Sequence, residues 1–285
     1  MNTARVEPRG CIIAHLRFVG AGRWWIGTGV SRSQARPCRR IRRRSRRVAP
    51  GPETWLAGGR MAEPAQYELI DHVGVVTLDD GKANAFGPVM IDTLNGLLDR
   101  AEGEARAVVL MGRSGVFSGG FDLKVIRGGD PVAARNMAEG GARLMMRLYG
   151  FPLPVVAAAT GHAVALGGFC LLTADYRVGA DGDFVIGLNE TAIGMSLPPF
   201  GLMLARERLS KRYLSRAAIG ATMFAPAEAR DAGFLDEVVA VDAVRDAALA
   251  AANNLVKLDG SSYAQVKQGL RAESIAGVLA GLDAA

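Results

Sequence analysis

The sequence predicts an α/β fold with parallel strand pairing over most of its length. Short continuous apolar runs, of which residues 107–111 and 154–159 are the clearest, have the length and composition of buried parallel strands. Segments with apolar residues at helical spacing separate these runs. Such alternation of strands and helices is typical of α/β folds.

The predicted elements begin near residue 61. Residues 67–78 alternate around His72-Val73-Gly74, which predicts a β-hairpin. Pro88 suits the first turn of a helix, and the apolar spacing continues that helix to residue 98. Four further elements are expected: helices at 131–148 and after Gly167, and strands at 176–178 and 184–186. Beyond Pro199 we expect mainly helix, with one short strand at Val238-Val239.

Residues 1–60 differ from the rest of the chain in charge. They contain 14 Arg and no Lys against two acids, Glu7 and Glu53, which gives +12. The remaining 225 residues hold 20 Lys and Arg against 26 Asp and Glu, which gives −6. The net charge of +6 therefore describes neither part. Because the basic extension is rich in Arg, Gly, Pro and Ser and lacks periodicity, we predict that it is disordered.

Several explanations of this extension stay open. An Arg-rich, acid-poor stretch is typical of an organelle presequence, although Pro and Gly interrupt an amphipathic helix. The same arginines suit a nucleic-acid arm, but we do not expect nucleic acid as a partner. A secretory signal would need an apolar segment after a short basic start, and residues 1–60 have none. The simplest interpretation is a start at Met61, the extension having no selected role.

The composition is that of an ordinary globular domain, with 49% hydrophobic and 22% charged residues. No uninterrupted apolar run reaches the roughly 18 residues that a membrane span needs, so no membrane partner is expected. The three cysteines, Cys11, Cys38 and Cys170, lack CxxC spacing and favour a reducing, cytoplasmic location over a disulfide framework or zinc site. Cys170 and His162 have no partner at meaningful spacing, and we interpret both as packing residues.

Two glycine-bearing turns each directly follow a predicted buried strand. Residues 117–124 (FSGGFDLK) follow the strand at 107–111, and residues 161–168 (GHAVALGG) follow the strand at 154–159. Glycine lets the backbone turn sharply and bring N–H groups close to a ligand, and the second turn also opens a helix with unpaired N–H donors. Two such turns can supply converging donors for an oxyanion. Neither matches GxGxxG or GxxxxGK(S/T), which argues against nucleotide-binding loops.

One carboxylate, Glu190, lies just after the predicted strand at 184–186, in the mainly apolar stretch IGLNETAIG. An apolar pocket raises the pKa of a carboxyl group and suits it to proton transfer. From the residues alone, two interpretations stay open. Glu190 transfers a proton, or it is a surface glutamate that caps the next turn.

At these residues the chain resembles the crotonase (enoyl-CoA hydratase/isomerase) family. FSGGFDLK is similar to the family's FSAGxDL element, and GHAVALGG followed by ADYR at 174–177 is similar to its second glycine element and CDYR segment. ADGDFVIGLNETAIG resembles the segment that carries the catalytic glutamate in mitochondrial-type Δ3-Δ2-enoyl-CoA isomerases. APAEA at 225–229 and GFLDEV at 233–238 resemble the late helix and strand. These elements occur in the right order over roughly residues 65–240, which favours a catalytic Glu190.

The resemblance implies an oxyanion hole formed by two backbone N–H groups. It assigns one to Phe121 and, counting back from Asp175, the other to Leu166. The family usually has glycine at this second position, so the donor is Gly167 instead if the turn is shifted by one residue.

The resemblance also implies contacts along the coenzyme A nucleotide, made by the first glycine element and by the early loop KANA at 82–85. The implied CoA-binding residues are Ala83, Asn84, Ala85, Gly119, Gly120, Asp122, Leu123 and Lys124. For Lys124, a solvated surface charge is the alternative.

A second departure from the family pattern bears on the reaction. Hydratases of the family carry two glutamates that hold the attacking water, and the position of the first is Phe169 in this chain. A site with one glutamate suits moving a proton within the substrate better than adding water. The resemblance therefore implies isomerisation of 3-enoyl-CoA to 2-enoyl-CoA in fatty acid metabolism, catalysed by Glu190. A hydratase or another crotonase reaction, and a weakly catalytic acyl-CoA- or RNA-binding protein, remain alternatives.

For the whole molecule, the resemblance implies a crotonase-like ββα spiral at 61–240 followed by a C-terminal helical region at 241–285. It implies a fatty acyl-CoA thioester as substrate and a homotrimer or a hexamer built from two trimers. No metal or redox cofactor is implied, because coenzyme A is part of the substrate.

Overall fold

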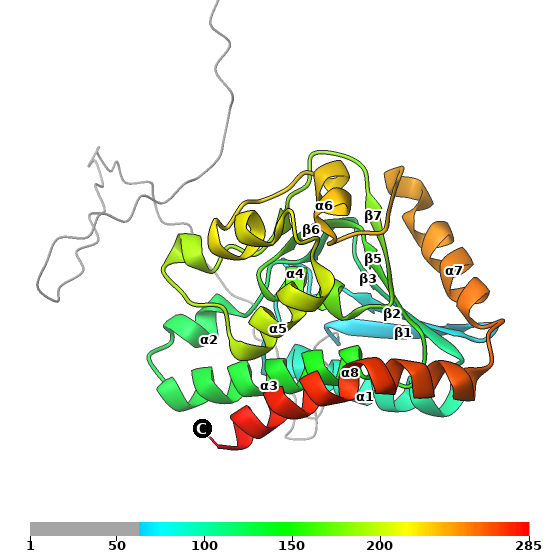
Figure 1. Ribbon diagram of the computed structural model, residues 1–285, viewed down its shortest axis with the longest axis horizontal. Coiled ribbons are helices and arrows are strands. Elements are labelled where there is room, and N and C mark those ends of the chain that lie inside the picture. The colour runs from blue at the N-terminus through cyan, green and yellow to red at the C-terminus, as the bar shows by residue number, and fades with distance from the viewer. Residues whose placement is uncertain (1–62, 285) are drawn as a thin grey trace, which may run out of the picture. The chain divides into compact units, whose positions relative to one another are not determined.

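The computed structural model describes residues 63–284, and the predicted N-terminal extension lies outside this part of the chain (Figure 1). The larger sheet of the described residues has six strands in the order β1-β2-β3-β5-β7-β9. These strands are β1 (Ala65–Ile70), β2 (Val73–Leu78), β3 (Ala107–Gly112), β5 (Val155–Ala159), β7 (Tyr176–Ala180) and β9 (Glu237–Val239). The β1–β2 hairpin is antiparallel, and every other neighbouring pair is parallel. The predicted α/β fold is confirmed.

A second sheet in the described part has three short parallel strands in the order β4-β6-β8. They are β4 (Gly115–Ser118), β6 (Gly161–Val164) and β8 (Ile186–Gly187). The two glycine-bearing segments were predicted as turns throughout, but their first residues are strand: β4 includes Phe117 and Ser118, and β6 is Gly161–Val164. The predicted strand at 184–186 is shorter and begins at Ile186.

Helices cover both faces of the six-stranded sheet. One face packs on α7 (Val244–Leu255), and the other packs on α1 (Pro88–Glu104) and α3 (Pro131–Tyr149). Figure 1 shows α7 on the opposite side of the strands from α1 and α3. The alternation along β3 explains this: Val109 belongs to the core under α7, whereas Val108 and Leu110 belong to the other core.

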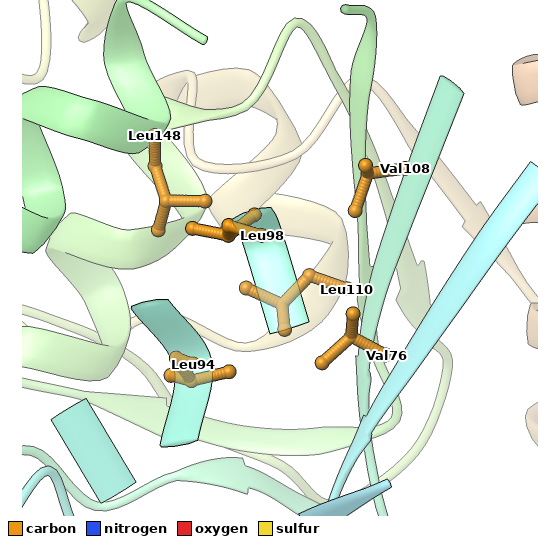
Figure 2. Close-up of a pocket in the computed structure, with 6 residues that line it drawn as sticks. All are labelled: Val76, Leu94, Leu98, Val108, Leu110 and Leu148. Carbon is orange, nitrogen blue, oxygen red and sulfur yellow. The ribbon is translucent and has the colours of Figure 1, made fainter. Parts of the chain in front are cut away.

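The core beneath α1 and α3 consists of interlocking aliphatic side chains. Figure 2 shows that leucines from both helices face side chains of β2 and β3. They enclose a gap of about 10 Å³, lined by Val76, Leu94, Leu98, Val108, Leu110 and Leu148. Because its lining is wholly apolar, we interpret this gap as core packing space rather than a ligand site.

Five further α-helices of the described part complete the fold. They are α2 (Leu123–Arg127), α4 (Leu166–Thr173), α5 (Pro199–Arg208), α6 (Pro226–Ala232) and α8 (Gly260–Asp283). The helix expected after Gly167 already includes that residue, since α4 begins at Leu166, and α2 was not predicted. The mainly helical character beyond Pro199 and the short strand at Val238-Val239 are confirmed.

The C-terminal helix α8 is attached to the core by buried charges. The Asp175 carboxylate accepts from Lys267 Nζ at 2.6 Å and from Arg271 Nη1 at 2.8 Å. Arg271 Nη1 also donates to the carbonyl of Tyr149, at the end of α3, and Lys267 Nζ donates to the carbonyl of Leu153. The C-terminal helical region therefore packs on the same body as the predicted spiral core.

Candidate active site

The small sheet places three predicted site residues at one edge. Because β4, β6 and β8 run parallel, their carboxyl ends lie at the same edge, where α/β proteins commonly bind ligands. Phe121 follows the end of β4, Leu166 follows the end of β6, and Glu190 follows the end of β8. Each is within three residues of its strand, so a ligand at this edge can contact all three segments.

The first glycine turn lies against the start of α4. Gly120 has φ +96, and a Cβ built on it would lie 2.9 Å from the Cβ of Ala165 and 3.3 Å from the nitrogen of Leu166. A side chain at Gly120 is therefore excluded by both conformation and space. The carbonyl of Gly120 accepts from the N–H of Phe86 at 2.8 Å, which fixes the chain just before Phe121.

The N–H groups predicted to form the oxyanion hole lack internal acceptors in the described residues. Within residues 63–284, the Phe121 N–H has no hydrogen-bond acceptor. Leu166 and Gly167 are the first two residues of α4, whose N–H groups have no intrahelical acceptor. Such groups are available to a ligand oxygen.

Glycine lets α4 begin directly on the ends of its neighbouring strands. A Cβ on Gly167 would lie 2.4 Å from the carbonyl oxygen of Ser118, at the end of β4. A Cβ on Gly168 would lie 2.8 Å from the carbonyl oxygen of Gly187, at the end of β8. Ala165, just before the helix, adopts φ +54, an unusual conformation for a residue with a side chain.

Glu190 is buried, and its side chain does not cap the following turn. The residue is 7% exposed, and its Oε2 atom has no hydrogen-bond partner in the described part of the chain. It precedes the short 3₁₀ helix η1 (Thr191–Ile193) without a side-chain capping bond, so the surface-cap interpretation is wrong. Burial raises the pKa of Glu190 above its ordinary value. The carboxyl group is thus suited to taking and returning a proton.

Phe169 occupies a fully packed position in α4. Its ring is 1% exposed and meets the ring of Phe200 edge to face at 5.5 Å. A Cβ on Gly201 in α5 would lie 2.6 Å from this ring, so no space remains for water beside it on that side. Among residues 63–284, Glu190 is the only buried carboxylate without an ion pair, because the Asp175 side chain, which is 9% exposed, pairs with two cations of α8. The structure therefore offers one buried acid for chemistry at this edge.

The predicted CoA-binding loops lie side by side. The carbonyl of Ala83 accepts from the N–H of Gly119 at 2.8 Å. Asp122 caps α2 by accepting from the N–H of Lys124 at 2.8 Å, and Leu123 is about half exposed. The Lys124 side chain is exposed and makes no ion pair within the described residues. Its proposed contact with a nucleotide phosphate stays a prediction.

Asn84 has a structural role that the sequence did not reveal. It is fully buried at φ +50, and its Nδ2 donates to the carbonyls of Leu78 and Phe117 at 3.0 and 3.1 Å. Its side-chain amide is therefore engaged inside the protein, and its backbone N–H and carbonyl are engaged with Asp80 and Ser118. The predicted contact of Asn84 with coenzyme A stays a prediction.

Asp80 was missed by the sequence analysis. Burial tends to raise its pKa, but N–H groups of Asn84, Ala85 and Lys82 donate to its carboxylate and lower the pKa overall. These bonds shape the loop that contacts Gly119. The available signal was the Asp79-Asp80-Gly81 run, a composition typical of turns whose aspartates bind nearby backbone.

Cys170 and His162 are packing residues, as predicted. Cys170 is fully buried, and burial raises the pKa of its thiol to about 12. His162 Nδ1 accepts from the N–H of Val185 at 3.0 Å, and its ring meets Phe184 edge to face.

No group of three or more His, Cys, Asp or Glu side chains in the described part could hold a metal ion. The expectation of a metal-free site stays a prediction. None of the helices of residues 63–284 is both long and apolar enough to cross a membrane.

The model of the enoyl-CoA hydratase/isomerase family matches residues 68–282. The chain belongs to this family. A solved structure of an enoyl-CoA hydratase/isomerase family protein from Pseudomonas syringae matches with a TM-score of 0.76 and 42% identity, covering 78% of this chain and 96% of that one. The resemblance seen in the sequence and the crotonase-like fold are both confirmed.

The curated relatives carry two different reaction names. Human mitochondrial enoyl-CoA delta isomerase 1 is 38% identical over 149 residues, which cover 51% of this chain and 49% of the relative. A probable enoyl-CoA hydratase of Rhodobacter capsulatus is 37% identical over 121 residues, covering 40% of this chain and 45% of the relative. The chain spans about half the length of these curated relatives. Family membership therefore leaves the reaction open.

Proposed function

We propose that this family member is a Δ3-Δ2-enoyl-CoA isomerase that acts on fatty acyl-CoA thioesters. The observation that carries the proposal is the one buried carboxylate at this edge of the small sheet, Glu190, whose Oε2 atom has no hydrogen-bond partner in the described residues. Phe169 fills the position where a second acid would be needed to hold water. One carboxylate is enough to move a proton within a substrate.

In the proposed reaction, Glu190 takes a proton from C2 of a 3-enoyl-CoA. The electron pair left at C2 spreads onto the thioester oxygen and the existing double bond, forming a dienolate. Glu190 then returns the proton to C4, which leaves the double bond between C2 and C3. The reaction needs neither water nor a redox partner, and the elevated pKa makes Glu190 a better proton acceptor at C2.

The N–H groups of Phe121 and Leu166 are the proposed donors to the dienolate oxygen. Both are free of internal acceptors in the described residues, and the turn at Gly120 approaches the nitrogen of Leu166 closely. This approach favours Leu166 over Gly167 as the second donor. Loss of one such donor typically lowers kcat by about 10²–10³-fold.

The Glu190→Gln variant tests the role of the carboxylate. We expect kcat to fall by about 10³-fold or more, because an amide cannot accept the proton, whereas affinity for a saturated acyl-CoA should change little. The measurement is stopped-flow appearance of conjugated 2-enoyl-CoA, with isothermal titration for binding. Glu102→Gln on the exposed side of α1 is the matched control and should retain wild-type turnover. Wild-type turnover in Glu190→Gln would exclude the mechanism.

A hydratase is the second candidate, because curated relatives include probable hydratases. Two assays on the full chain distinguish the reactions. The first follows conjugated product from a 3-enoyl-CoA, and the second follows loss of the conjugated absorbance from a 2-enoyl-CoA. Product in the first assay alone supports the isomerase, whereas comparable activity in the second requires an acid other than Glu190 that holds water.

We propose the cytoplasm as the location, on the sparse cysteine content. The human relative is named as mitochondrial, so fractionation of cells that express the full chain is the direct measurement.

A further inference from the structure

Two adjacent glycines lie in the middle of α3. Glycine is a poor helix former because it loses the most backbone freedom on folding, so its presence inside a 19-residue helix calls for a reason. Gly141 interrupts a row of large buried side chains at helical spacing, between Met137 and Met145. Gly140, next to it, lies on a partly exposed side of the helix.

The two glycines have different surroundings. A Cβ on Gly140 would lie 3.6 Å from Cγ2 of Ile91, an ordinary van der Waals contact. A Cβ on Gly141 would lie 2.5 Å from Cε1 and 2.7 Å from Cζ of Phe121, and 3.4 Å from Cδ2 of Leu166. The Phe121 ring thus lies on bare helix backbone. The side chain of Leu166 reaches the same spot.

We infer that Gly141 is a positioning residue for the oxyanion donors. Because Gly141 has no side chain, the Phe121 ring and the Leu166 side chain can both pack against α3 at this point. This inference rests on the proposed function only in naming Phe121 and Leu166 as the donors. Phe121 and Leu166, which pack against α3 at Gly141, are the two residues whose N–H groups are proposed to bind the thioester oxygen.

The backbone on both sides of Phe121 is held by hydrogen bonds, so the ring and the Phe121 N–H share one short segment. The carbonyl of Gly120 is bound to Phe86, and Asp122 caps α2. A phenylalanine side chain also has only two rotatable bonds. A methyl group at Gly141 would require the ring to retreat by about 1 Å to reach an ordinary contact. We expect part of this displacement to pass to the Phe121 N–H, and misplacing a donor by about 1 Å can lower turnover by about 10²-fold.

The experiment compares Gly141→Ala with Gly140→Ala in the full chain. We expect Gly141→Ala to lower kcat for a 3-enoyl-CoA by about 10–100-fold with little change in KM, because the dienolate is affected more than the substrate. Gly140→Ala should keep wild-type turnover and raise Tm by about 2–4 °C through better helix propensity. Equal turnover in the two variants would contradict the inference.

A second-site variant tests whether the Phe121 ring transmits the effect. Leucine at position 121 keeps the backbone N–H but lacks Cε1 and Cζ. In the Phe121→Leu background, adding Gly141→Ala should therefore lower kcat by less than about threefold, so the two changes are strongly coupled. The double variant should also fold even if Gly141→Ala alone does not. An unfolded double variant, or an undiminished loss of kcat, would contradict the inference.

An infrared measurement separates this inference from the proposed reaction. The probe is hexanoyl-CoA labelled with ¹³C at the thioester carbonyl, which cannot isomerise. Binding to wild type should lower the carbonyl stretching frequency, and Gly141→Ala, but not Gly140→Ala, should lose most of that shift. If wild type shows the shift but no isomerisation, the reaction is wrong and the inference stands. If bound probe shows no shift in wild type, the inference is wrong.

Discussion

Glu190 occupies a position where its negative charge is unfavourable. The side chain is buried, its Oε2 atom has no hydrogen-bond partner in the described residues, and no ion pair includes it there. Burial of a carboxylate without such partners disfavours the ionised form, which is why its pKa is raised. The same isolation that makes the group a useful base should therefore reduce the stability of the fold.

This cost has a defined dependence on pH. Because the pKa of Glu190 is higher in the folded than in the unfolded state, the folded protein binds this proton more tightly. Its contribution to stability is present below the unfolded pKa and is lost as pH rises through the folded pKa. We expect Glu190→Gln to be more stable than wild type at pH 8 and to show a smaller difference at pH 4.5. Urea unfolding at both pH values, with Glu102→Gln as control, measures this. A pH-independent difference would contradict the assignment.

The roles of single residues could be predicted from the sequence only in part. The local sequence left Glu190 open between a buried base and a surface cap, and the resemblance of its segment to the family favoured the base. The role of Asn84 could not be predicted, since its amide binds the carbonyl of Phe117, 33 residues away. Gly141 was also beyond prediction, because nothing in the local sequence distinguishes it from Gly140. The role of Gly141 depends on the Phe121 ring, which comes from a separate segment of the chain.

At the scale of elements, long apolar runs were predictable and short strands were not. β3 and β5 are continuous aliphatic runs, buried on both faces of the larger sheet. β4 and β6 have four residues each, and both begin with glycine. A Cβ on Gly161, in β6, would lie 2.0 Å from the backbone of Gly115, in β4. The small sheet thus depends on close backbone approach, for which strand propensity gives no signal.

The attachment of α8 gives a prediction at this scale. The side chains of Lys267 and Arg271 are 5% and 11% exposed, and both contact the carboxylate of Asp175. Asp175→Ala should lower the free energy of unfolding by about 3–5 kcal/mol, since it leaves two cations buried without their carboxylate. Asp99→Ala is the control, because Asp99 pairs with Arg147 at the surface and should contribute less than about 1 kcal/mol.

Urea unfolding monitored by circular dichroism measures both variants. A loss below about 1 kcal/mol in Asp175→Ala would mean that α8 is held mainly by its apolar contacts rather than by the buried charges. Sequence reasoning could not find this cluster, because 92 and 96 residues separate Asp175 from its two partners.

At the scale of the whole molecule, the described surface keeps several large apolar side chains in contact with solvent. On α8, Val266 and Leu270 are 62% and 77% exposed and lie one helical turn apart. Beyond Glu190, Ile193 and Met195 are 55% and 45% exposed. Apolar groups gathered in this way are typical of surfaces that contact another protein.

We expect these surfaces to be covered by further copies of this chain, in a trimer or a hexamer. Sedimentation velocity on the full chain of 30.0 kDa should then give a mass of about 90 or 180 kDa. The Val266→Asp/Leu270→Asp and Ile193→Asp/Met195→Asp variants place charge on each surface in turn, and the one that buries an interface should sediment as a smaller species. Val89→Asp, at an exposed position in α1, is the control. A wild-type mass of 30.0 kDa at micromolar concentration would contradict the prediction.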